Sequence, residues 1–304
     1  MKIAQVCPYF YPEMIGGIEW YALNICLELV RQGHDLHIFT ANLRHGRRIG
    51  PAEEVVDGIY VHRLPLRVDL TYRVKLWQGL YSRLTEEPFD LIHVYDYAQI
   101  HSFIATQAGR RHSIPTMMTV FDLHFMIPHP FYKRLPMTIF DRLFARWILR
   151  SVDKLLVRTP ILIPPLVSLG ARKETMIITP SGIRQEALDQ ANGELFRQKF
   201  GIKGSLVLYV GRLHPMKGPQ FLIQAAPIIL KNVSDASIVI MGPDQVNYRK
   251  DLLRLAKRLN VTDHIYFVEP IYNTMEKMKV YAACDVLALP SGYEGFGQVL
   301  VEAM

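Results

Sequence analysis

The sequence predicts an α/β protein of two doubly wound domains, each built on a parallel sheet with helices on both faces. The main observation is that short apolar runs of strand length alternate with longer helical patterns along most of the chain. A length of 304 residues also exceeds what one hydrophobic core usually supports. A polar, turn-rich stretch near residues 181–203 interrupts the alternation. We therefore expect one domain over residues 1–185 and a second over residues 186–304.

The apolar patterns place each element of these two domains. In the first domain, strands are expected at residues 2–7, 36–40, 59–64, 91–95, 116–120, 154–158 and 176–179. Helices are expected between them at residues 20–31, 72–84, 100–111 and 135–149. In the second domain, a strand at residues 205–210 precedes a helix at 221–230, and a strand at 286–289 precedes a short terminal helix. This alternation is typical of parallel sheets covered by helices.

Composition favours a water-soluble protein of a reducing compartment. Half of the residues are apolar and 21% are charged, without an apolar run of about 18 residues that would span a membrane. The chain moves from Met1 directly into a strand and shows no signal peptide. Cys7, Cys26 and Cys284 lie in apolar surroundings without metal-ligand spacing, which is typical of buried thiols. We therefore expect a cytoplasmic protein.

A glycine-flanked turn near the C-terminus is the strongest sign of a binding site. Glu294 is followed by Gly295, Phe296 and Gly297, and Glu302 lies eight positions after Glu294. The pattern predicts a strand, a loop and then a helix whose first backbone N–H groups are free for a ligand. Eight residues of helix make little more than two turns, so both glutamates are expected on one side of this element. Two carboxylates on one face suggest a polyol ligand.

Complementary positive charge follows the strand at residues 205–210. The loop after this strand contains Arg212 and Lys217, and parallel sheets bind ligands at the carboxyl ends of their strands. Arginine offers a bidentate fork and lysine a point charge, which are the two ways that side chains hold a diphosphate. Taken alone, each residue is more simply a solvated surface charge. Together with the glutamate turn, they favour a site for a phosphorylated ligand.

These motifs, in this order, resemble those of the retaining glycosyltransferases of family 4, also called glycosyltransferase group 1. The resemblance covers nearly the whole chain. It rests on three segments: Gly16-Gly17-Ile18-Glu19, Gly211-Arg212-Leu213 with Lys217-Gly218, and Glu294-Gly295-Phe296-Gly297 with Glu302. It implies the GT-B fold, in which two Rossmann-like domains face each other across a cleft. It also implies a hexosyltransferase-type enzyme of class EC 2.4 that moves a sugar from a nucleotide-diphosphate sugar to an acceptor hydroxyl with retention.

The resemblance also assigns roles on the donor side. Arg212 and Lys217 would hold the diphosphate, and Glu302 would accept the ribose hydroxyls. Glu294 would hold the transferred sugar together with the backbone amides of Gly295, Phe296 and Gly297. The loop with Gly16 and Gly17 would face the diphosphate, where glycines allow a close approach of the backbone. No cofactor besides the donor substrate is implied.

On the acceptor side the chain departs from the family pattern. Family members commonly carry a histidine where this chain has Phe121, followed by the aspartate found here as Asp122. A phenylalanine ring can only stack, so a polar contact is lost. His124 lies three residues further and would compensate if the loop turns it toward the ligand. Asp122 would contact an acceptor hydroxyl or cap the loop. The implied catalytic residues are therefore Glu294, Asp122 and His124.

Metal chemistry is not expected. His34 and His37 flank the second strand, but a third ligand at suitable spacing does not follow, so we interpret them as structural. The family typically has no obligatory metal of the kind that an Asp-x-Asp motif holds. Charge on the leaving diphosphate would instead be met by Arg212, Lys217 and backbone amides.

The net charge of +7 favours polyanionic partners. Arginines recur at nearly helical spacing beside aromatic residues, at Arg134, Arg142, Arg146 and Arg150. This pattern leaves two interpretations open. One is a peripheral contact with the anionic inner face of a membrane, where a lipid-linked acceptor would lie. The other is an ordinary amphipathic helix with its arginines in water.

Three other functions are alternatives to sugar transfer. A non-catalytic nucleotide-binding remnant of the same fold is motivated by Phe121 and by the point at which the chain stops. Family members continue for several strands and helices after the second glutamate, so the second domain is expected to be incomplete and the helix around Glu302 unstable by itself. An epimerase acting on nucleotide sugars would need more acid and base residues. A nucleic-acid partner is not expected, because no recognisable motif accompanies the charge.

Overall fold

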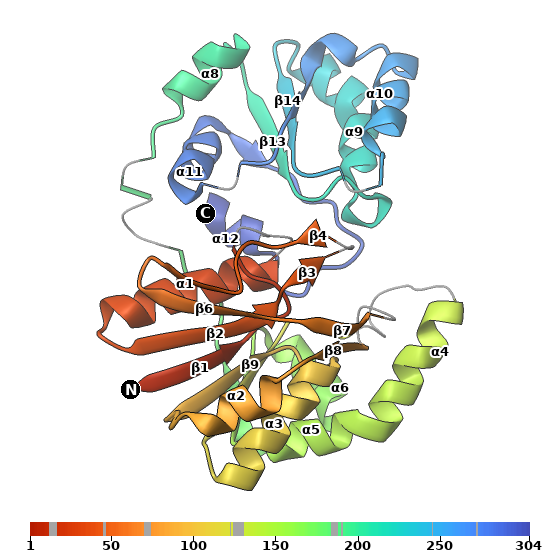
Figure 1. Ribbon diagram of the computed structural model, residues 1–304. Helices are drawn as coiled ribbons and strands as arrows, with labels where there is room; N and C mark the ends of the chain where they lie inside the picture. The colour runs from red at the N-terminus through yellow and green to blue at the C-terminus, as the bar shows by residue number, and fades with distance from the viewer. Residues whose placement is uncertain are drawn as a thin grey trace. The chain divides into compact units, whose positions relative to one another are not determined.

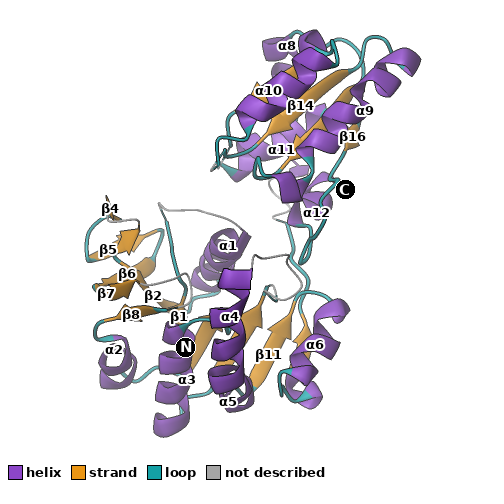
Figure 2. Ribbon diagram, turned by 90° about the vertical axis from the view of Figure 1, so that its right-hand side faces the viewer, coloured by secondary structure: helices purple, strands orange, loops and turns teal. Residues whose placement is uncertain are grey.

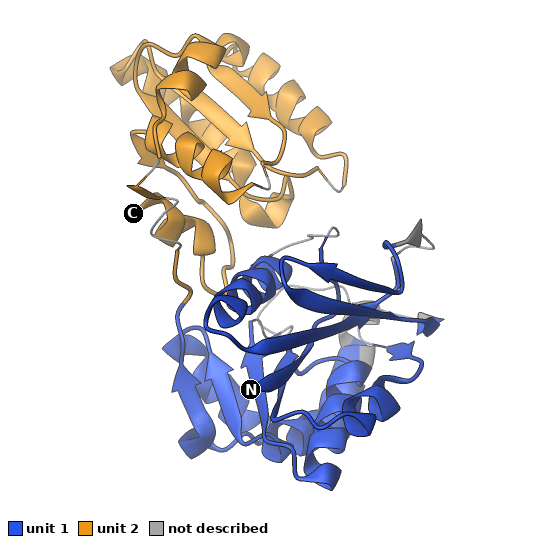
Figure 3. Cartoon of the chain, turned by 60° about the vertical axis from the view of Figure 1, so that its left-hand side comes forward, with its two compact units in different colours: residues 1–180 blue, residues 181–304 orange. Residues whose placement is uncertain are grey.

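The computed structural model describes residues 1–11, 17–44, 47–69, 74–121, 123, 131–183, 188–189, 191–244, 246–271 and 273–304. The chain forms two compact units, residues 1–180 and residues 181–304 (Figure 3). The sequence placed the boundary five residues later, at 185. Each unit has its own sheet and its own apolar cores.

The first unit is built on an eight-stranded sheet with the order β12-β11-β10-β9-β1-β2-β6-β5. Neighbouring strands are parallel except for β5 and β6 at one edge. The strands are β1 (Lys2–Val6), β2 (Asp35–Ala41), β5 (Glu53–Val56), β6 (Ile59–Leu64), β9 (Leu91–Tyr95), β10 (Thr116–Val120), β11 (Lys154–Val157) and β12 (Met176–Ile178). The expected strands at 59–64, 91–95 and 116–120 are confirmed to the residue. Most of their residues are buried, as is typical of a parallel sheet with helices on both faces.

Helices cover both faces of this sheet (Figure 2). On one face, α1 (Gly17–Arg31) contributes Ala22 and Cys26 to a core that also contains Ile3 and Ile38. The other face carries the larger core, with α2 (Leu80–Glu86), α3 (Ile100–His112), α5 (Arg146–Ser151) and α6 (Ile163–Ser168). The expected helix at 135–149 begins earlier, as α4 (Phe131–Phe140), and passes through a π-helical turn at Asp141–Ala145.

The helix expected at 72–84 is wrong in its described first part. Residues Lys75–Trp77 form strand β8, which pairs antiparallel with β7 (Leu66–Asp69). Lys75 and Trp77 are buried and Leu76 between them is exposed, which is the period of a strand. The helical part begins only after Gly79, whose φ of 81° breaks the path between the two elements. A second two-stranded ribbon joins β3 (Leu43–Arg44) to β4 (Arg47–Arg48).

The second unit has a parallel four-stranded sheet with the order β15-β14-β13-β16. Its strands are β13 (Leu206–Val210), β14 (Ser237–Met241), β15 (Ile265–Val268) and β16 (Val286–Leu287). One face packs against α9 (Pro219–Asn232) and α10 (Arg249–Arg258), and the other against α8 (Glu194–Phe200), α11 (Thr274–Ala283) and α12 (Gln298–Ala303) (Figure 1). The sheet grows from β13 in both directions. The gap between β13 and β16 is therefore the topological switch point, where open α/β sheets bind ligands.

The stretch expected as a linker, residues 181–203, contains helix α8, so this expectation is wrong for its second half. Phe196 and Phe200 of α8 pack into the core of the second unit, with the Phe200 ring 6.2 Å from the Tyr266 ring. A Cβ at Gly193 would lie 2.3 Å from the Cα of Ala283, so only glycine allows this approach. Tertiary packing thus stabilises a segment whose local sequence is polar and rich in turns.

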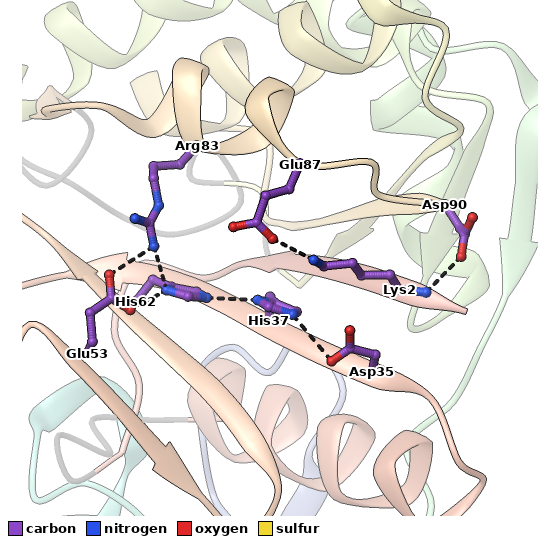
Figure 4. A network of polar contacts seen from close by, with 8 residues as sticks. All are labelled: Lys2, Asp35, His37, Glu53, His62, Arg83, Glu87 and Asp90. Atoms are coloured by element: carbon purple, nitrogen blue, oxygen red, sulfur yellow. Dashed lines mark hydrogen bonds and ion pairs between the residues drawn. The ribbon is translucent and has the colours of Figure 1, made fainter.

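A polar network lies on the first unit's sheet beneath α2 (Figure 4). His37 Nδ1 and His62 Nε2 are 2.9 Å apart, and the two rings are nearly parallel at 7°. His62 Nδ1 contacts Glu53, whose other carboxylate oxygen accepts a 2.9 Å hydrogen bond from Arg83. Burial lowers the pKa of His62, although Glu53 acts in the opposite direction. His37, interpreted as structural from sequence, is thus part of a network that ties edge strand β5 to β2, β6 and α2, with Asp35 3.3 Å from its Nε2.

Acidification should destabilise the first unit, because two buried histidines are held neutral. Burial lowers the pKa of His93 and of His101 to about 3, compared with about 6.5 in an unfolded chain. Between these values the unfolded chain binds a proton that the folded unit does not. The free energy of unfolding is therefore highest above pH 6.5 and falls as the pH drops toward 3. The expected loss is about 1.4 kcal/mol per pH unit for each histidine.

Tryptophan fluorescence in urea measures this effect, because Trp20, Trp77 and Trp147 all lie in the first unit. His93 Nε2 lies 2.8 Å from Thr119 Oγ1, and His93→Gln keeps a polar group at that position. In this variant, the free energy of unfolding should fall less steeply between about pH 6 and pH 4.5, by about 1.4 kcal/mol per pH unit compared with the wild type. A wild-type slope in His93→Gln would show that this histidine is not kept neutral.

Candidate active site

The loop after β13 is held in a defined shape by its own backbone and by neighbouring strands. Gly211 N donates to Met241 O at 3.0 Å, and the Tyr209 hydroxyl donates to Arg212 O at 2.9 Å. A short 3₁₀ turn at Pro215–Lys217 follows, and His214 Nδ1 accepts a hydrogen bond from Met216 N at 3.1 Å. Lys217 is thereby placed at the end of a rigid turn that begins at the carboxyl end of β13.

The loop after β16 packs directly against this turn. Gly218 has φ +76°, and a Cβ there would lie 1.9 Å from Pro290 O. Gly292 N donates to Met216 O at 2.9 Å. The two segments, about 75 residues apart in sequence, therefore meet through backbone contacts at the switch point of the sheet.

Lys217 and Glu294 form the centre of the site. Lys217 Nζ lies 2.8 Å from Glu294 Oε1 and donates to Tyr293 O at 3.3 Å. Ser291 Oγ donates to the same Glu294 oxygen at 2.7 Å. The Lys217 and Glu294 side chains are 16% and 28% exposed, so their charges are shielded from bulk water yet still accessible. The structure thus joins the cation and the carboxylate that the sequence assigned to a diphosphate and to a sugar.

Arg212 adds a positive charge beside this cluster, and His214 adds a hydrogen-bonding ring. Arg212 is exposed. The pKa of His214 is lowered by partial burial and then by the positive charges of Arg212 and Lys217. A neutral His214 whose Nδ1 accepts from Met216 carries its hydrogen on Nε2, where it is available to a ligand. Sequence reasoning did not select His214, and its position two residues after Arg212 was the only signal.

The expectation of helical geometry over all eight residues from Glu294 to Glu302 is wrong. Helix α12 begins at Gln298, and Gly297 before it has φ 72°. This left-handed residue separates Glu294, which lies in the loop, from Glu302, which lies in the helix. The predicted helix around Glu302 nevertheless forms, since Val299 and Ala303 pack against the core that includes α11.

Glu302 is held by two residues of α11 that sequence reasoning missed. Lys277 Nζ lies 2.8 Å from its Oε1, and the Tyr281 hydroxyl donates to its Oε2 at 2.7 Å. The pair Lys277 and Glu302 is 17% and 10% exposed. The spacing of four residues between Lys277 and Tyr281 was only a weak signal in the sequence, because polar pairs at this spacing occur on most helices.

Only some of the residues predicted on the acceptor side lie in the described part of the first unit. Gly16, Asp122 and His124 lie outside the described residues. Gly17 is the first residue of α1, and a Cβ there would meet nothing within 4 Å. Within the described residues, a side chain at this position would therefore meet no steric conflict.

Phe121, where the family pattern has a histidine, is buried among aromatic side chains. Its ring lies 5.3 Å from the Tyr21 ring in an edge-to-face arrangement. The Arg158 guanidinium is 4.5 Å from the Tyr21 centroid and 5.3 Å from the Phe121 centroid. Phe121 thus exchanges a polar contact for packing and cation–π attraction, as expected of a ring that can only stack.

Metal ligands are not gathered in the described ranges: these contain no group of three His, Cys, Asp or Glu side chains arranged to hold an ion. The carboxylates of the site each have a lysine partner instead. Two parallel-sheet units with a charged site at the switch point of the second are typical of enzymes that bind nucleotides or related phosphates.

Comparisons with known proteins identify the class. A family model described as "Glycosyl transferase 4-like domain" matches residues 16–182, and one described as "Glycosyl transferases group 1" matches residues 193–304. D-inositol 3-phosphate glycosyltransferase of Nocardia farcinica is 25% identical over 310 residues, which are 95% of this chain and 67% of the relative. The protein of the same name from Mycolicibacterium smegmatis is 25% identical over 315 residues, covering 95% and 68%.

Two solved structures share this fold over nearly the whole of this chain. Sucrose-phosphate synthase from Thermosynechococcus elongatus has a TM-score of 0.77 at 20% identity, covering 99% of this chain and 78% of the other. Anabaena HepE, solved in complex with UDP and glucose, has a TM-score of 0.74 at 19% identity, covering 100% and 78%. The chain belongs to the glycosyltransferase 4-like family and is a glycosyltransferase of the GT-B fold.

Replacing Gly218 by alanine should disrupt the site, because its Cβ would collide with Pro290 O. We expect Gly218→Ala to lower the free energy of unfolding by at least about 2 kcal/mol, from strain at positive φ plus the clash. Gly201→Ala is a matched control, since Gly201 has φ +65° but a Cβ there meets nothing within 4 Å. It should cost about 1 kcal/mol. Urea unfolding followed by circular dichroism measures both, and equal losses would contradict the close contact at Pro290.

Proposed function

We propose that this glycosyltransferase moves a sugar from a nucleotide-diphosphate sugar to an acceptor hydroxyl with retention at the anomeric carbon, and that Lys217 and Glu294 lie in its donor site. The observation that carries the proposal is the meeting of these two residues at the switch point of the second unit's sheet. Support also comes from Anabaena HepE, which was solved with UDP and with UDP-glucose. The alternative of a non-catalytic nucleotide-binding remnant is less well supported, since the family models and the similar curated proteins are named as glycosyltransferases.

Lys217 is suited to hold a diphosphate without losing its place. An ammonium group has three N–H donors. Two acceptors, Glu294 Oε1 and Tyr293 O, lie at 2.8 and 3.3 Å, which leaves one donor for a phosphate oxygen. Arg212 would add a bidentate contact from the exposed side of the loop, and His214 Nε2 a neutral hydrogen bond. Together they would stabilise the negative charge that develops on the leaving diphosphate, without a metal ion.

The carboxylates would bind hydroxyl groups. Glu294, with the backbone amides of Gly295, Phe296 and Gly297, would hold the transferred sugar. Its Oε1 already accepts from Lys217 and Ser291, so its Oε2 is the oxygen available for a sugar hydroxyl. Glu302 would accept the hydroxyls of the ribose.

On the acceptor side, Gly16, Gly17, Asp122 and His124 keep the roles that the family resemblance implies. The acceptor would be a sugar or a lipid-linked sugar, in the synthesis of a polysaccharide, glycolipid or other glycoconjugate. WaaG, which shares this fold with a TM-score of 0.71 at 19% identity, is described as a glycosyltransferase involved in lipopolysaccharide biosynthesis.

Loss of the lysine charge should weaken donor binding more than folding. We expect Lys217→Met to lower the affinity for a nucleoside diphosphate about 10- to 100-fold, the value of one hydrogen bond to a charged group. Lys250→Met, at an exposed position of α10, should bind as the wild type does. Isothermal titration with UDP, GDP and ADP measures affinity and also identifies the base. Undiminished binding by Lys217→Met would remove Lys217 from the donor site.

Retention is tested on the product itself. Proton NMR of the product of a transfer assay gives the anomeric configuration, which should equal that of the donor sugar. An inverted product would overturn the mechanistic part of the proposal and leave the donor site intact. The same assay run with EDTA should proceed at the same rate, and a rate restored only by added metal ion would overturn the metal-free assignment.

We also propose that the first unit contacts the anionic inner face of a membrane from the cytoplasm. Leu135, Ile139 and Leu143 are 50%, 49% and 66% exposed, and their spacing of four residues places them on one side of α4 and the π-helical turn. Arg142 and Arg146 are exposed in the same segment. Exposed apolar side chains beside arginines suit a lipid surface of negative charge. Within the described ranges, no helix has both the length and the apolarity to cross a membrane.

A hollow of about 540 Å³ beside this stripe is lined by both types of residue. It is bordered by Phe103, Gln107, Arg110, Arg111, Leu143, Phe144 and Trp147. Arginines above an apolar floor could accept a phosphorylated headgroup, which would bring a lipid-linked acceptor to the enzyme. The competing interpretation is an ordinary solvated helix.

Polar substitution of the stripe distinguishes the two interpretations. The triple variant Leu135→Ser, Ile139→Ser and Leu143→Ser should lose most of its sedimentation with vesicles that contain anionic lipid, because it removes the apolar anchor. Ile228→Ser is the control, since Ile228 is 69% exposed on α9 of the second unit. Wild-type protein that sediments no better with anionic than with neutral vesicles would contradict the proposal.

A further inference from the structure

Glu302 differs from a surface glutamate in that both of its oxygens are already engaged. Oε1 contacts Lys277 Nζ at 2.8 Å, and Oε2 accepts a hydrogen bond from the Tyr281 hydroxyl at 2.7 Å. Lys277 and Tyr281 lie four residues apart on α11, so they project from the same side of that helix. Two donors on two different oxygens fix the plane of the carboxylate as well as its position.

Burial makes this arrangement rigid. Glu302 and Lys277 are 10% and 17% exposed, and Tyr281 is 6% exposed. Another pair on α11, Lys279 with Glu276, has a similar separation of 2.6 Å but is 35% and 57% exposed. Surface pairs of that kind contribute little, because water screens them and the side chains stay mobile. The Glu302 carboxylate is therefore preorganised, and its conformational entropy is lost on folding rather than on ligand binding.

The lysine also changes what the carboxylate can recognise. An unpaired negative charge near a diphosphate site would repel the ligand. Lys277 offsets the charge of Glu302, while Tyr281 remains a neutral donor because burial and Glu302 both raise the pKa of its hydroxyl. Each carboxylate oxygen retains a second lone pair. The group is thus suited to accept hydrogen bonds from two neighbouring neutral hydroxyls.

We propose that Lys277 and Tyr281 are positioning residues that fix Glu302 for the two vicinal hydroxyls of a ribose, and that they set the preference of the enzyme for ribonucleotides over 2′-deoxyribonucleotides. This inference rests on the proposed donor-site role of Glu302. Lys277 and Tyr281 would orient Glu302 so that it accepts hydrogen bonds from both hydroxyls at once. A carboxylate free to rotate would satisfy a single hydroxyl almost as well as a pair, and the preference would fall.

Binding of matched nucleotides tests the proposal. Isothermal titration would compare UDP with 2′-deoxy-UDP, and GDP with 2′-deoxy-GDP, on wild type, Tyr281→Phe, Lys277→Met and Lys279→Met. We expect the wild type to favour the ribonucleotide at least about tenfold, the value of one hydrogen bond to a charged group. Tyr281→Phe and Lys277→Met should lose most of that ratio, mainly through weaker ribonucleotide binding. Lys279→Met should keep it, and Lys277→Arg should largely restore it.

Each outcome bears on the inference separately from the proposed function. If the variants bind both nucleotides more weakly by the same factor, Lys277 and Tyr281 only support the fold, and the inference is overturned. It is also overturned if the wild type binds nucleotides without preference, or if the variants keep the wild-type ratio; in both cases the donor site stands. If the wild type binds neither UDP, GDP nor ADP, the proposed function itself fails. Tyr281→Phe removes one oxygen atom only, so it should fold even if Lys277→Met does not.

Discussion

The parallel pairing of β13 with a strand on each side is the constraint on which the second unit depends. β13 pairs with β14 on one side and with β16 on the other, and the chain must cross the sheet by helices on opposite faces to reach them. The loops that follow β13 and β16 therefore both begin at the carboxyl ends of neighbouring parallel strands. Their backbones come close enough that Gly218 has no room for a side chain against Pro290. The site is a consequence of strand order.

Each glutamate of the candidate site is paired with a lysine, which bears on the binding of an anion proposed for this site. Glu294 is paired with Lys217 and Glu302 with Lys277, so neither carboxylate presents an uncompensated charge. Arg212 and His214 then leave the loop with a surplus of donors on one side. The pairs also fix the orientation of the carboxylates, which a flexible side chain in water would not maintain. In the proposed donor site, the carboxylates would bind hydroxyl groups and the neighbouring cations would bind phosphate.

The sheet of the first unit carries several buried polar side chains, among them His37, His62 and His93. The side chains of His37, His62, Glu53 and Arg83 contact one another beneath α2 (Figure 4), and this network reaches the edge strand β5. Burial also lowers the pKa of His93 and of His101, which favours their neutral forms inside the unit. Phe121, where the family pattern has a histidine, needs no hydrogen-bond partner. Its ring packs edge-to-face against Tyr21 and lies close to the Arg158 guanidinium.

The sequence alone determined the fold class, the strands at 59–64, 91–95 and 116–120, and the segments that carry Lys217 and Glu294, because burial on a parallel sheet imposes a pattern that is visible locally. It did not determine the strand at Lys75–Trp77 or the helix α8, whose partners lie elsewhere in the chain. Only the tertiary structure showed that Gly297 separates the two glutamates and that Lys277 and Tyr281 hold Glu302. The physical reason is that the local sequence sets the pattern of buried and exposed residues in each element. The partner of a charged group depends instead on which loops the helical crossovers bring together at the carboxyl ends of the strands.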